Sequence, residues 1–480
     1  MREAAAYQKI LTSLKRRKNG ATAADICAST ALPLSVIEEL LPKAADEYSG
    51  HLRVTESGEI LYHFPNGFKN RYKGFAAAAR RFFGKASIII KNIFTFLFKV
   101  WIMVMLIGYF VLFIALTLAV IFLQIASKSN EKKGGFGLIG ALWRIWFYSA
   151  ITNTHPRYYG DYEYKKVNKE PKRPMHTAIF SFVFGEKDPN KNWDEEVNRA
   201  VISYLQANKG VITLVEYMAF SGESCIEAEQ SILAFCSRYE GSPEVTEDGT
   251  IIYRFDKLLM KSEKDKFSEL IPPVKKLKIF SANKKSMNAA FGIINTVNLL
   301  FGSYFLYQSI TVGQIISAEQ FQTVSTLYGS VNFLLGYLIN QPHTIILPVL
   351  GIIPAAFSLI FWLIPALRYI NLKKENEEIK TINFNRFSYN KIWSSPENIE
   401  ENTLRQKIEE YKPKNFKTAF DKVIKNISAV FSPDIKITDD GKTIYSFNEL
   451  KREKQALEKY RNSLDTANLQ IGKKVFDSNE

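Results

Sequence analysis

Residues able to do chemistry are thinly spread along this chain of 480 residues. Its five histidines stand apart from one another and from the cysteines, and none has the spacing of a zinc ligand pair. The cysteines Cys27, Cys225 and Cys236 likewise form no closely spaced pair. We find no P-loop, nucleophile elbow or paired-carboxylate arrangement. We therefore predict a protein that is not an enzyme, with no catalytic residue, no cofactor and no metal.

Two groups of residues could bind a ligand. The glycine run 135–140 matches G-x-G-x-x-G, but polar residues 127–133 precede it where a dinucleotide-binding loop requires a strand. We interpret it as a hinge into the aromatic cluster within 143–148, which would lie in the headgroup layer of a membrane. The second group is a lysine set that could contact nucleic acid, another anion or lipid, or be a solvated surface. It consists of Lys414, Lys417, Lys422 and Lys425, at a predicted helix over 415–431.

The composition indicates a membrane protein with soluble modules. Hydrophobic residues make up 46% of the chain and charged residues 23%, with a formal net charge of +15. These values exclude a disordered tail, a collagen-like fibre and a disulfide scaffold. The mean hydropathy of −0.10 hides a contrast, because long charge-free runs alternate with lysine-rich stretches.

Two apolar blocks have the length of membrane spans. Residues 100–126 contain no ionisable side chain, and a helix of this length extends about 40 Å. In the second block, residues 287–310 and 344–367 are each long enough to cross a bilayer. The stretch 321–340 between them is more polar, and it could be a third span, a re-entrant segment or an interfacial helix.

Basic flanks set the predicted orientation. Eight Lys and Arg but no acid occur in 68–99, and nine Lys face three acids in 257–285. Positive charge near span ends stays on the cytoplasmic side, so each block should cross an even number of times. In the first block this favours a hairpin near Gly108 or a re-entrant helix, whereas its length favours a single span that leaves the middle module outside. We expect a multi-pass protein of the bacterial cytoplasmic membrane whose soluble modules are mainly cytoplasmic.

One sequence motif occurs three times. Residues 54–64 read V-T-E-S-G-E-I-L-Y-H-F, residues 245–255 read V-T-E-D-G-T-I-I-Y-R-F, and residues 437–447 read I-T-D-D-G-K-T-I-Y-S-F. Each copy predicts two strands joined by an acidic turn, because glycine supplies the positive φ that such a turn needs. The turn glycines are Gly58, Gly249 and Gly441, which lie 191 and 192 residues apart.

Three helical segments precede each hairpin, an order typical of a winged helix. The predicted helices are, copy by copy, 3–18, 22–29 and 35–48; 193–208, 213–220 and 223–239; and 384–393, 400–411 and 415–431. The third copy is degenerate, because Pro413 replaces the glycine of the turn. The predicted fold class is an α+β membrane protein with three winged-helix-like modules separated by two transmembrane blocks.

These patterns divide the chain into eight predicted segments. They are winged-helix-like module 1 (1–67), a basic amphipathic helix with transmembrane block 1 (68–130), a glycine- and aromatic-rich interfacial segment with a lysine-rich linker (131–178), winged-helix-like module 2 (179–258), a basic linker (259–285), transmembrane block 2 (286–368), degenerate winged-helix-like module 3 (369–448) and a charged helical tail (449–480). The tail is expected to pack on module 3 or to pair with a partner.

The charges of the modules bear on their partners. A DNA-binding winged helix carries cations on its last helix, because the duplex is anionic. In module 1 the last predicted helix has four acids against Lys43, and in module 2 it has no basic residue before Arg238. We expect modules 1 and 2 to contact proteins or to act as scaffolding, and only module 3 to suit nucleic acid. Membrane lipid is the other expected partner. A homo-oligomer is a further possibility that the sequence leaves undecided.

The segment 180–190 reads F-S-F-V-F-G-E-K-D-P-N and precedes Trp193 and the second wing motif. Its alternating phenylalanines predict one face of a strand or staple, and D-P-N predicts a turn before a helix. In these parts and their order, the chain resembles an uncharacterised family of integral membrane proteins of cyanobacteria and plastids with winged-helix-like repeats. Some plastid members are labelled with iron–sulphur biogenesis, for which the three cysteines here offer no support. The resemblance implies no catalytic role.

The leading hypothesis is a non-enzymatic scaffold of the cytoplasmic membrane that presents its modules to protein partners. One alternative is a membrane-tethered winged-helix DNA-binding regulator that acts through module 3. The other is a transporter or channel component built on the second block. Transport predicts that amides such as Asn295, Asn298 and Asn332 line a shared cavity.

Overall fold

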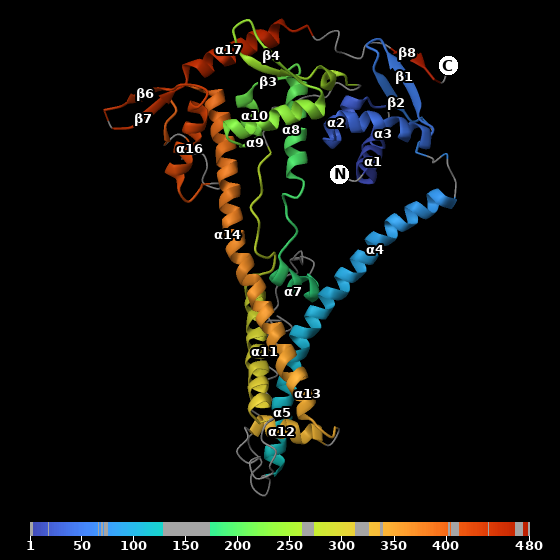
Figure 1. Cartoon of the computed structure of the whole chain (residues 1–480), viewed down its shortest axis with the longest axis vertical. Helices are drawn as coiled ribbons and strands as arrows, with labels where there is room; N and C mark the ends of the chain where they lie inside the picture. Colours follow the sequence, from blue (N-terminus) through green and yellow to red (C-terminus); the bar gives the residue numbers. More distant parts are fainter. Residues whose placement is uncertain are drawn as a thin grey trace, which may run out of the picture. The chain divides into compact units, whose positions relative to one another are not determined.

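Helices dominate the structure, a computed structural model that also contains three small antiparallel sheets (Figure 1). It describes residues 3–17, 19–65, 67–68, 71, 75–127, 173–261, 273–312, 326–336, 339–401, 404, 412–439, 441–465 and 474–478. The glycine run and the aromatic cluster of 135–148 lie outside these residues. The chain divides into two compact units: unit 1 is Met1–Phe82, Asp188–Lys278 and Lys374–Glu480, and unit 2 is Phe83–Lys187 and Ile279–Lys373.

Module 1 consists of three helices followed by a hairpin, in the order that its sequence predicts. The elements are α1 (Glu3–Leu14), α2 (Ala23–Thr30), α3 (Leu34–Glu47), β1 (His51–Thr55) and β2 (Ile60–His63). Helix α2 begins with a capping box, in which the Asp25 amide donates to the Thr22 hydroxyl and the Thr22 amide donates to the Asp25 carboxylate. Apolar side chains of the other two helices, such as Ile10 of α1 and Ile37 of α3, are fully buried.

Module 2 repeats this order. Its elements are α8 (Trp193–Ala207), β3 (Val211–Ile212), α9 (Leu214–Ser221), α10 (Cys225–Tyr239), β4 (Ser242–Val245), β5 (Ile251–Arg254) and the short 3₁₀ helix η2 (Asp256–Leu259). Helix α9 also begins with a capping box, made by Thr213 and Glu216. The strand order in its sheet is β3-β5-β4.

Module 3 obtains its first helix from a longer one. Helix α14 (Ile353–Ser394) is continuous from the second apolar block to the residues predicted as the first helix of module 3. The remaining elements of this region are α16 (Phe416–Ser428), β6 (Asp434–Ile437), β7 (Thr443–Ser446), α17 (Asn448–Ser463) and β8 (Lys474–Asp477). Most of the helix predicted over 400–411 lies outside the described residues.

The three hairpins share one register. In each hairpin a tyrosine of the second strand lies opposite the second residue of the first strand. The pairs are Tyr62 with Leu52, Tyr253 with Pro243, and Tyr445 with Ile435. On its other side, the same tyrosine pairs with Ala21, Ile212 or Ile399, respectively. The same small antiparallel sheet is therefore built three times.

The three modules share one hydrophobic core within unit 1. It contains Ile37 of α3, Phe235 of α10 and Val423 of α16 in a single cluster of buried side chains. Tyr239 also donates a hydrogen bond of 2.9 Å to the carbonyl of Ala31. Because the modules are packed together, all three must lie on the same side of any membrane that the chain crosses.

The first apolar block is one helix in the described residues. Helices α4 (Phe75–Met103) and α5 (Tyr109–Ser127) are joined by a π-helical turn, η1 (Val104–Gly108). The predicted hairpin near Gly108 is therefore wrong. A hairpin would leave backbone groups unpaired in lipid, whereas a helix pairs them internally. In this widened π-helical turn, the Leu106 carbonyl accepts a hydrogen bond of 2.8 Å from the Asn298 side chain.

Within the residues that the structure describes, three helices are long and apolar enough to cross a membrane: Ile89–Phe122, Lys285–Val312 and His343–Ser394. The second of these helices is α11 (Lys285–Val312), and the third consists of α13 (His343–Ile345), η4 (Ile346–Ile352) and α14. Unit 2 also contains α7 (Met175–Phe184) and α12 (Thr326–Gly336). Helix α12 has 11 residues and extends about 16 Å. The described part of 321–340 is therefore too short to be a third span of the second block.

Two clusters of buried side chains mark the two ends of the unit 2 bundle. One contains Ile102, Phe182, Phe291 and Phe361, and the other contains Phe113, Phe305 and Leu350. The α4–α5 helix and α11 run from the first cluster to the second, and α14 returns. Helix α7 belongs to the first cluster, so it lies at the same end of the bundle as Ile102 of α4.

Candidate functional site

The F-S-F-V-F-G segment forms the second half of helix α7, so the strand predicted from its alternation is wrong. The rings of Phe180 and Phe184 pack at a tilt with centroids 4.8 Å apart, because residues four apart share a helical face. Phe182 is buried in the core of the bundle. The helix ends at Gly185, whose φ of +86° favours glycine. Because more than one face of this helix is apolar, its phenylalanines alternate along the sequence as they would in a strand.

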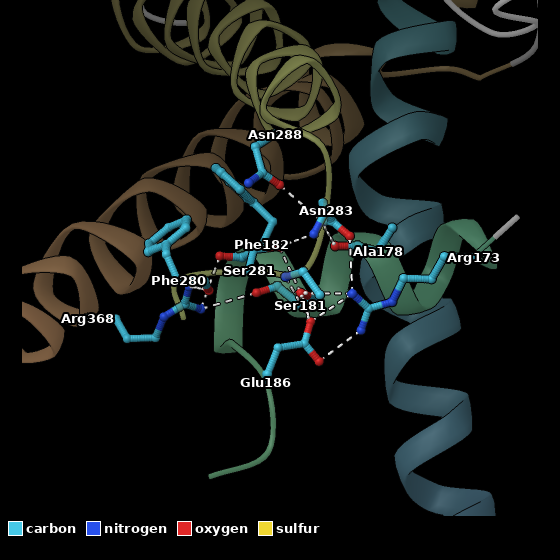
Figure 2. A network of polar contacts seen from close by, with 11 residues as sticks. Arg173, Ala178, Ser181, Phe182, Glu186, Phe280, Ser281, Asn283, Asn288 and Arg368 are labelled. Atoms are coloured by element: carbon cyan, nitrogen blue, oxygen red, sulfur yellow. Dashed lines mark hydrogen bonds and ion pairs between the residues drawn. The ribbon is translucent and has the colours of Figure 1, made fainter. Parts of the chain in front are cut away.

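A carboxylate and a guanidinium form the centre of a polar cluster around α7 (Figure 2). Arg173 donates two parallel hydrogen bonds of 2.7 and 2.9 Å to Glu186. The Ser181 hydroxyl and the Ala282 amide also donate to Glu186. These hydrogen bonds, that of Arg173 above all, lower the pKa of Glu186 to about 2. The carboxylate stays ionised near neutral pH and is a poor general acid or base.

The Ser181 side chain is not arranged as a nucleophile. It is 1% exposed, and its hydroxyl lies between the Glu186 carboxylate and the Ser281 hydroxyl, 2.8 Å away. A serine nucleophile needs access to substrate and a base that can take its proton. In the part of the chain that the structure describes, no histidine hydrogen-bonds to Ser181. The geometry therefore favours a structural role for this serine.

Arg368 of α14 binds the carboxyl end of α7. It donates to the Phe182 carbonyl at 3.1 Å and also to the Phe280 carbonyl, and its guanidinium lies 4.2 Å from the Phe280 ring centroid. The last carbonyls of a helix lack helical partners, and a cation there also opposes the helix dipole. A Cβ on Gly185 would lie 3.3 Å from the Arg368 guanidinium carbon. Glycine at this position therefore leaves room for the arginine.

The segment leading into α11 is fixed in the same cluster (Figure 2). The Asn283 side-chain amide donates to the Ala178 carbonyl at 2.7 Å and to the Asn288 side chain at 3.0 Å. Together with the contacts of Ser281 and Ala282, these bonds attach the start of α11 to α7. Because the cluster joins α7, α11 and α14 through satisfied hydrogen bonds, it determines how these helices pack.

Within unit 1, asparagines bind the backbone of an extended segment, residues 273–278. Asn190 of the D-P-N sequence donates to the Lys276 carbonyl at 2.7 Å and accepts from the Lys276 amide at 2.8 Å. Asn383 makes the same pair of bonds with Lys275, and Asn376 makes it with Lys278. Each asparagine side chain thus satisfies one backbone amide and one carbonyl of the segment, as a neighbouring β-strand would. The only sequence signal was the spacing of 376 and 383, which places both asparagines on one face of α14.

The predicted lysine set lies on and just before α16. Lys414, Lys417, Lys422 and Lys425 are all exposed. The backbone amide of Lys414 donates to Glu377 at 3.1 Å. The opposite face of α16 is buried through residues such as Phe420 and Val423. The structure thus presents three exposed cations on α16 and a fourth just before it, without showing what they contact.

The wing-turn glycines have the geometry that their turns require. Gly58, Gly249 and Gly441 have φ values of +80°, +81° and +70°. Space around each is open, since a Cβ built there has no neighbour within 4 Å. Substitution would therefore strain the backbone without a steric clash.

The three cysteines are buried and free. Burial raises the pKa of the Cys236 thiol to about 11 and that of Cys27 further. Such thiols are unreactive near neutral pH. A search of the described residues finds no group of three or more histidine, cysteine, aspartate or glutamate side chains that could hold a metal ion.

A buried charged cluster in module 2 was not anticipated from the sequence. Arg461 of α17 lies 2.8 Å from Glu216, which is 3% exposed and also accepts from the Tyr204 hydroxyl at 2.5 Å. Burial and the charge of Glu216 raise the pKa of the neighbouring Glu453 to about 7. The tail therefore packs on module 2, with Leu457 buried against Val211.

Comparison with known proteins identifies one distant homologue, the uncharacterised chloroplast protein At5g03900 of Arabidopsis thaliana. The two are 23% identical over 399 residues, which cover 78% of this chain and 70% of the Arabidopsis protein. The chain is thus a distant relative of an uncharacterised chloroplast protein. No protein-family model matches the chain, and no solved structure matches it.

Proposed function

We propose that this chain is a non-enzymatic membrane scaffold whose winged-helix-like modules bind protein partners. The observation that carries the proposal is the surface of α10, the helix that would read DNA in a winged-helix protein. Ile226 is 71% exposed there and Leu233 is 48% exposed, and both lie among the acids Glu227 and Glu229. An apolar and acidic surface repels phosphate and suits a protein partner.

The proposal places the modules on the cytoplasmic face of a bacterial membrane. The end of the bundle that contains α7 carries cations of α4, α11 and α14. They are Lys91, Lys99, Lys285, Arg368 and Lys373. The described residues of 104–127, 300–312, 326–336 and 339–367 contain no Lys or Arg. Residues 128–133 add three lysines and one glutamate beyond α5, fewer than the eight bases of 68–99. Cations gather on the cytoplasmic side of membranes.

A photo-crosslinking residue at position 226 of the full chain tests the proposal in intact membranes. We expect a discrete protein adduct that Leu233→Glu removes, because a buried charge would disrupt the contact. The matched control is the same crosslinker at Thr12, an exposed residue of α1. Equal adducts at both positions, or adducts that ignore Leu233→Glu, would refute a partner site on α10.

A DNA-binding regulator is the second candidate, because all four lysines of the predicted set are exposed. It predicts salt-dependent binding of a random DNA duplex by the full chain, lost in a Lys417→Glu, Lys422→Glu, Lys425→Glu variant. The scaffold proposal predicts little binding and little difference between the two proteins.

Transport receives less support from the buried amides. Asn295 and Asn298 are 0% exposed, and they donate to the carbonyls of Ser358 and Leu106. Both side-chain amides therefore join neighbouring helices. The transport alternative requires instead that they line a cavity.

A further inference from the structure

The outer strands of the hairpins differ in what covers them. In module 1, the C-terminal strand β8 pairs antiparallel with the outer edge of β1, which places Asp477 opposite Arg53. The Arg53 side chain donates to Asp477 at 2.8 Å, and the Ser478 amide donates to the Leu52 carbonyl at 3.0 Å. In module 3, the outer strand β6 pairs only with β7 in the part of the chain that the structure describes. Figure 1 shows β8 beside β1 and the β6–β7 hairpin with no third strand.

The shared register shows which residues of β6 correspond to those of β1. Leu52 and Ile435 both lie opposite the equivalent tyrosine of their hairpins, Tyr62 and Tyr445, so Lys436 stands where Arg53 stands. Ile437 accordingly stands where Val54 pairs with Phe476 of β8. The cation that binds Asp477 in module 1 thus has a counterpart in module 3.

The backbone groups of the two edges also correspond. In module 1 the outward amide of Leu52 donates to Ser478. The pairing of Thr438 with Lys442 is the equivalent of Thr55 with Glu59, so the amide of Ile435 points outward in the same way. Module 2 has Pro243 at this position, which removes the donor. An edge open to an added strand is therefore present in module 3 and blocked in module 2.

The exposed side chains of β6 favour the binding of another strand along its edge. Ile435 is 59% exposed and Ile437 is 74% exposed. An uncovered apolar edge on a two-stranded sheet is an unfavourable surface that proteins normally cover or charge. Lys436 between them adds a preference for an acidic residue.

We propose that β6 is a docking edge for an extended, acidic segment of a partner protein, which adds as an antiparallel third strand and places a carboxylate opposite Lys436. The occupant should share with β8 two adjacent apolar residues followed by an aspartate, since β8 reads K-V-F-D and its Asp477 lies opposite Arg53. This inference rests on the proposed scaffold function and names the kind of partner that one of its surfaces takes. A second copy of the chain is a weaker occupant, because its β8 is held on its own β1.

A labelled synthetic peptide with the sequence of residues 471–480 tests the proposal on the purified full-length protein. We expect saturable binding that weakens at least about tenfold in Lys436→Glu and recovers when the peptide carries Asp477→Lys, because the charges are then exchanged. Ile435→Pro should abolish binding, since it removes the outward amide as Pro243 does in module 2. Lys436 is exposed, so the charge variant should fold normally.

Three results would overturn the docking edge: no saturable binding, binding unchanged by Lys436→Glu and Ile435→Pro, or binding lost instead in Arg53→Glu. The last would mean that the peptide displaces β8 from β1. The crosslinking adduct at position 226 reports on α10 and is independent of β6. Loss of that adduct would remove the scaffold proposal, whereas loss of peptide binding alone would remove only this inference.

Discussion

The second helices of modules 1 and 2 both begin with a capping box whose acid pairs with an arginine. The two arginines come from different parts of the chain. In module 1 the acid of the capping box, Asp25, binds Arg17, which follows the module's own first helix, at 3.1 Å. In module 2 the acid is Glu216, and its arginine, Arg461, comes from the C-terminal helix α17. Both acids are almost fully buried, so both need a cation.

This difference shows that module 1 completes its cap locally, whereas module 2 depends on the tail. The dependence extends over several contacts, since Tyr460 of α17 also donates to Glu244 of β4 at 3.0 Å. The tail then continues to β8 on module 1. We infer that the tail serves to hold the modules together in unit 1, which is the arrangement that a scaffold needs.

Replacement of the arginine from the tail should have the largest effect. Arg461→Ala leaves Glu216 buried without its cation and removes the bond to the Val211 carbonyl. We expect a loss of about 3–5 kcal/mol in the free energy of unfolding, measured by urea titration of the detergent-solubilised chain. Arg452→Ala, an exposed arginine on the same helix, is the matched control and should change it by less than about 0.5 kcal/mol. Equal losses in the two variants would contradict the dependence of module 2 on the tail.

The local arginine of module 1 should matter less. In Arg17→Ala the Thr22 amide and hydroxyl still donate to Asp25. We expect a loss of about 1–3 kcal/mol, seen as faster hydrogen exchange in α2 and not in α9. Faster exchange that spreads equally to module 2 would show that the two caps are not independent.

A pH dependence should distinguish module 2, because the tail brings Glu453 beside Glu216. The pKa of Glu453 is raised from 4.5 to about 7 in the folded chain, so the folded state holds this proton more tightly than the unfolded state. Stability should therefore fall as pH rises from about 4.5 to about 7 and then level off. Glu453→Gln should remove this fall and gain about 1–3 kcal/mol relative to the natural chain above pH 7. Parallel pH profiles of the two proteins in urea unfolding would contradict the buried position of Glu453.

The smallest effects should come from removal of the capping hydroxyls. These substitutions test whether the capping boxes of α2 and α9 contribute equally to stability. Thr22→Ala and Thr213→Ala each remove one hydrogen bond to a helix amide, and Thr22→Ala also removes the bond that the Thr22 hydroxyl donates to the Met260 carbonyl. We expect both to cost about 1 kcal/mol, as measured by thermal unfolding. Serine at either position should restore the stability. Costs that differ by more than about twofold would mean that the two caps are not equivalent.

Local patterns were readable in the sequence because their causes are local. The motif around Gly58, Gly249 and Gly441 predicted the hairpins, since the turn needs glycine and the strands alternate. The spans over 287–310 and 344–367 were confirmed as apolar helices of sufficient length. The helices predicted over 22–29 and 213–220 likewise agree with α2 and α9.

Contacts between distant segments were not readable. Arg461 and Glu216 are 245 residues apart, and nothing in either local sequence identifies the other. The helix of the F-S-F-V-F-G segment was mistaken for a strand, because burial on several sides masks its period. The hairpin near Gly108 was inferred from charge, whereas the backbone continues as a helix through this residue.

Labelling of single exposed cysteines from one side of sealed membranes tests the central claim, that all three modules lie on one side. Suitable positions are Glu39 of module 1, Ser237 of module 2, Thr418 of module 3 and Gln341 at the other end of the bundle. The natural cysteines are buried and should react little. We predict that an impermeant maleimide labels the three module positions from the same side and position 341 from the other. Labelling of position 237 from the side opposite to 39 and 418 would contradict the account.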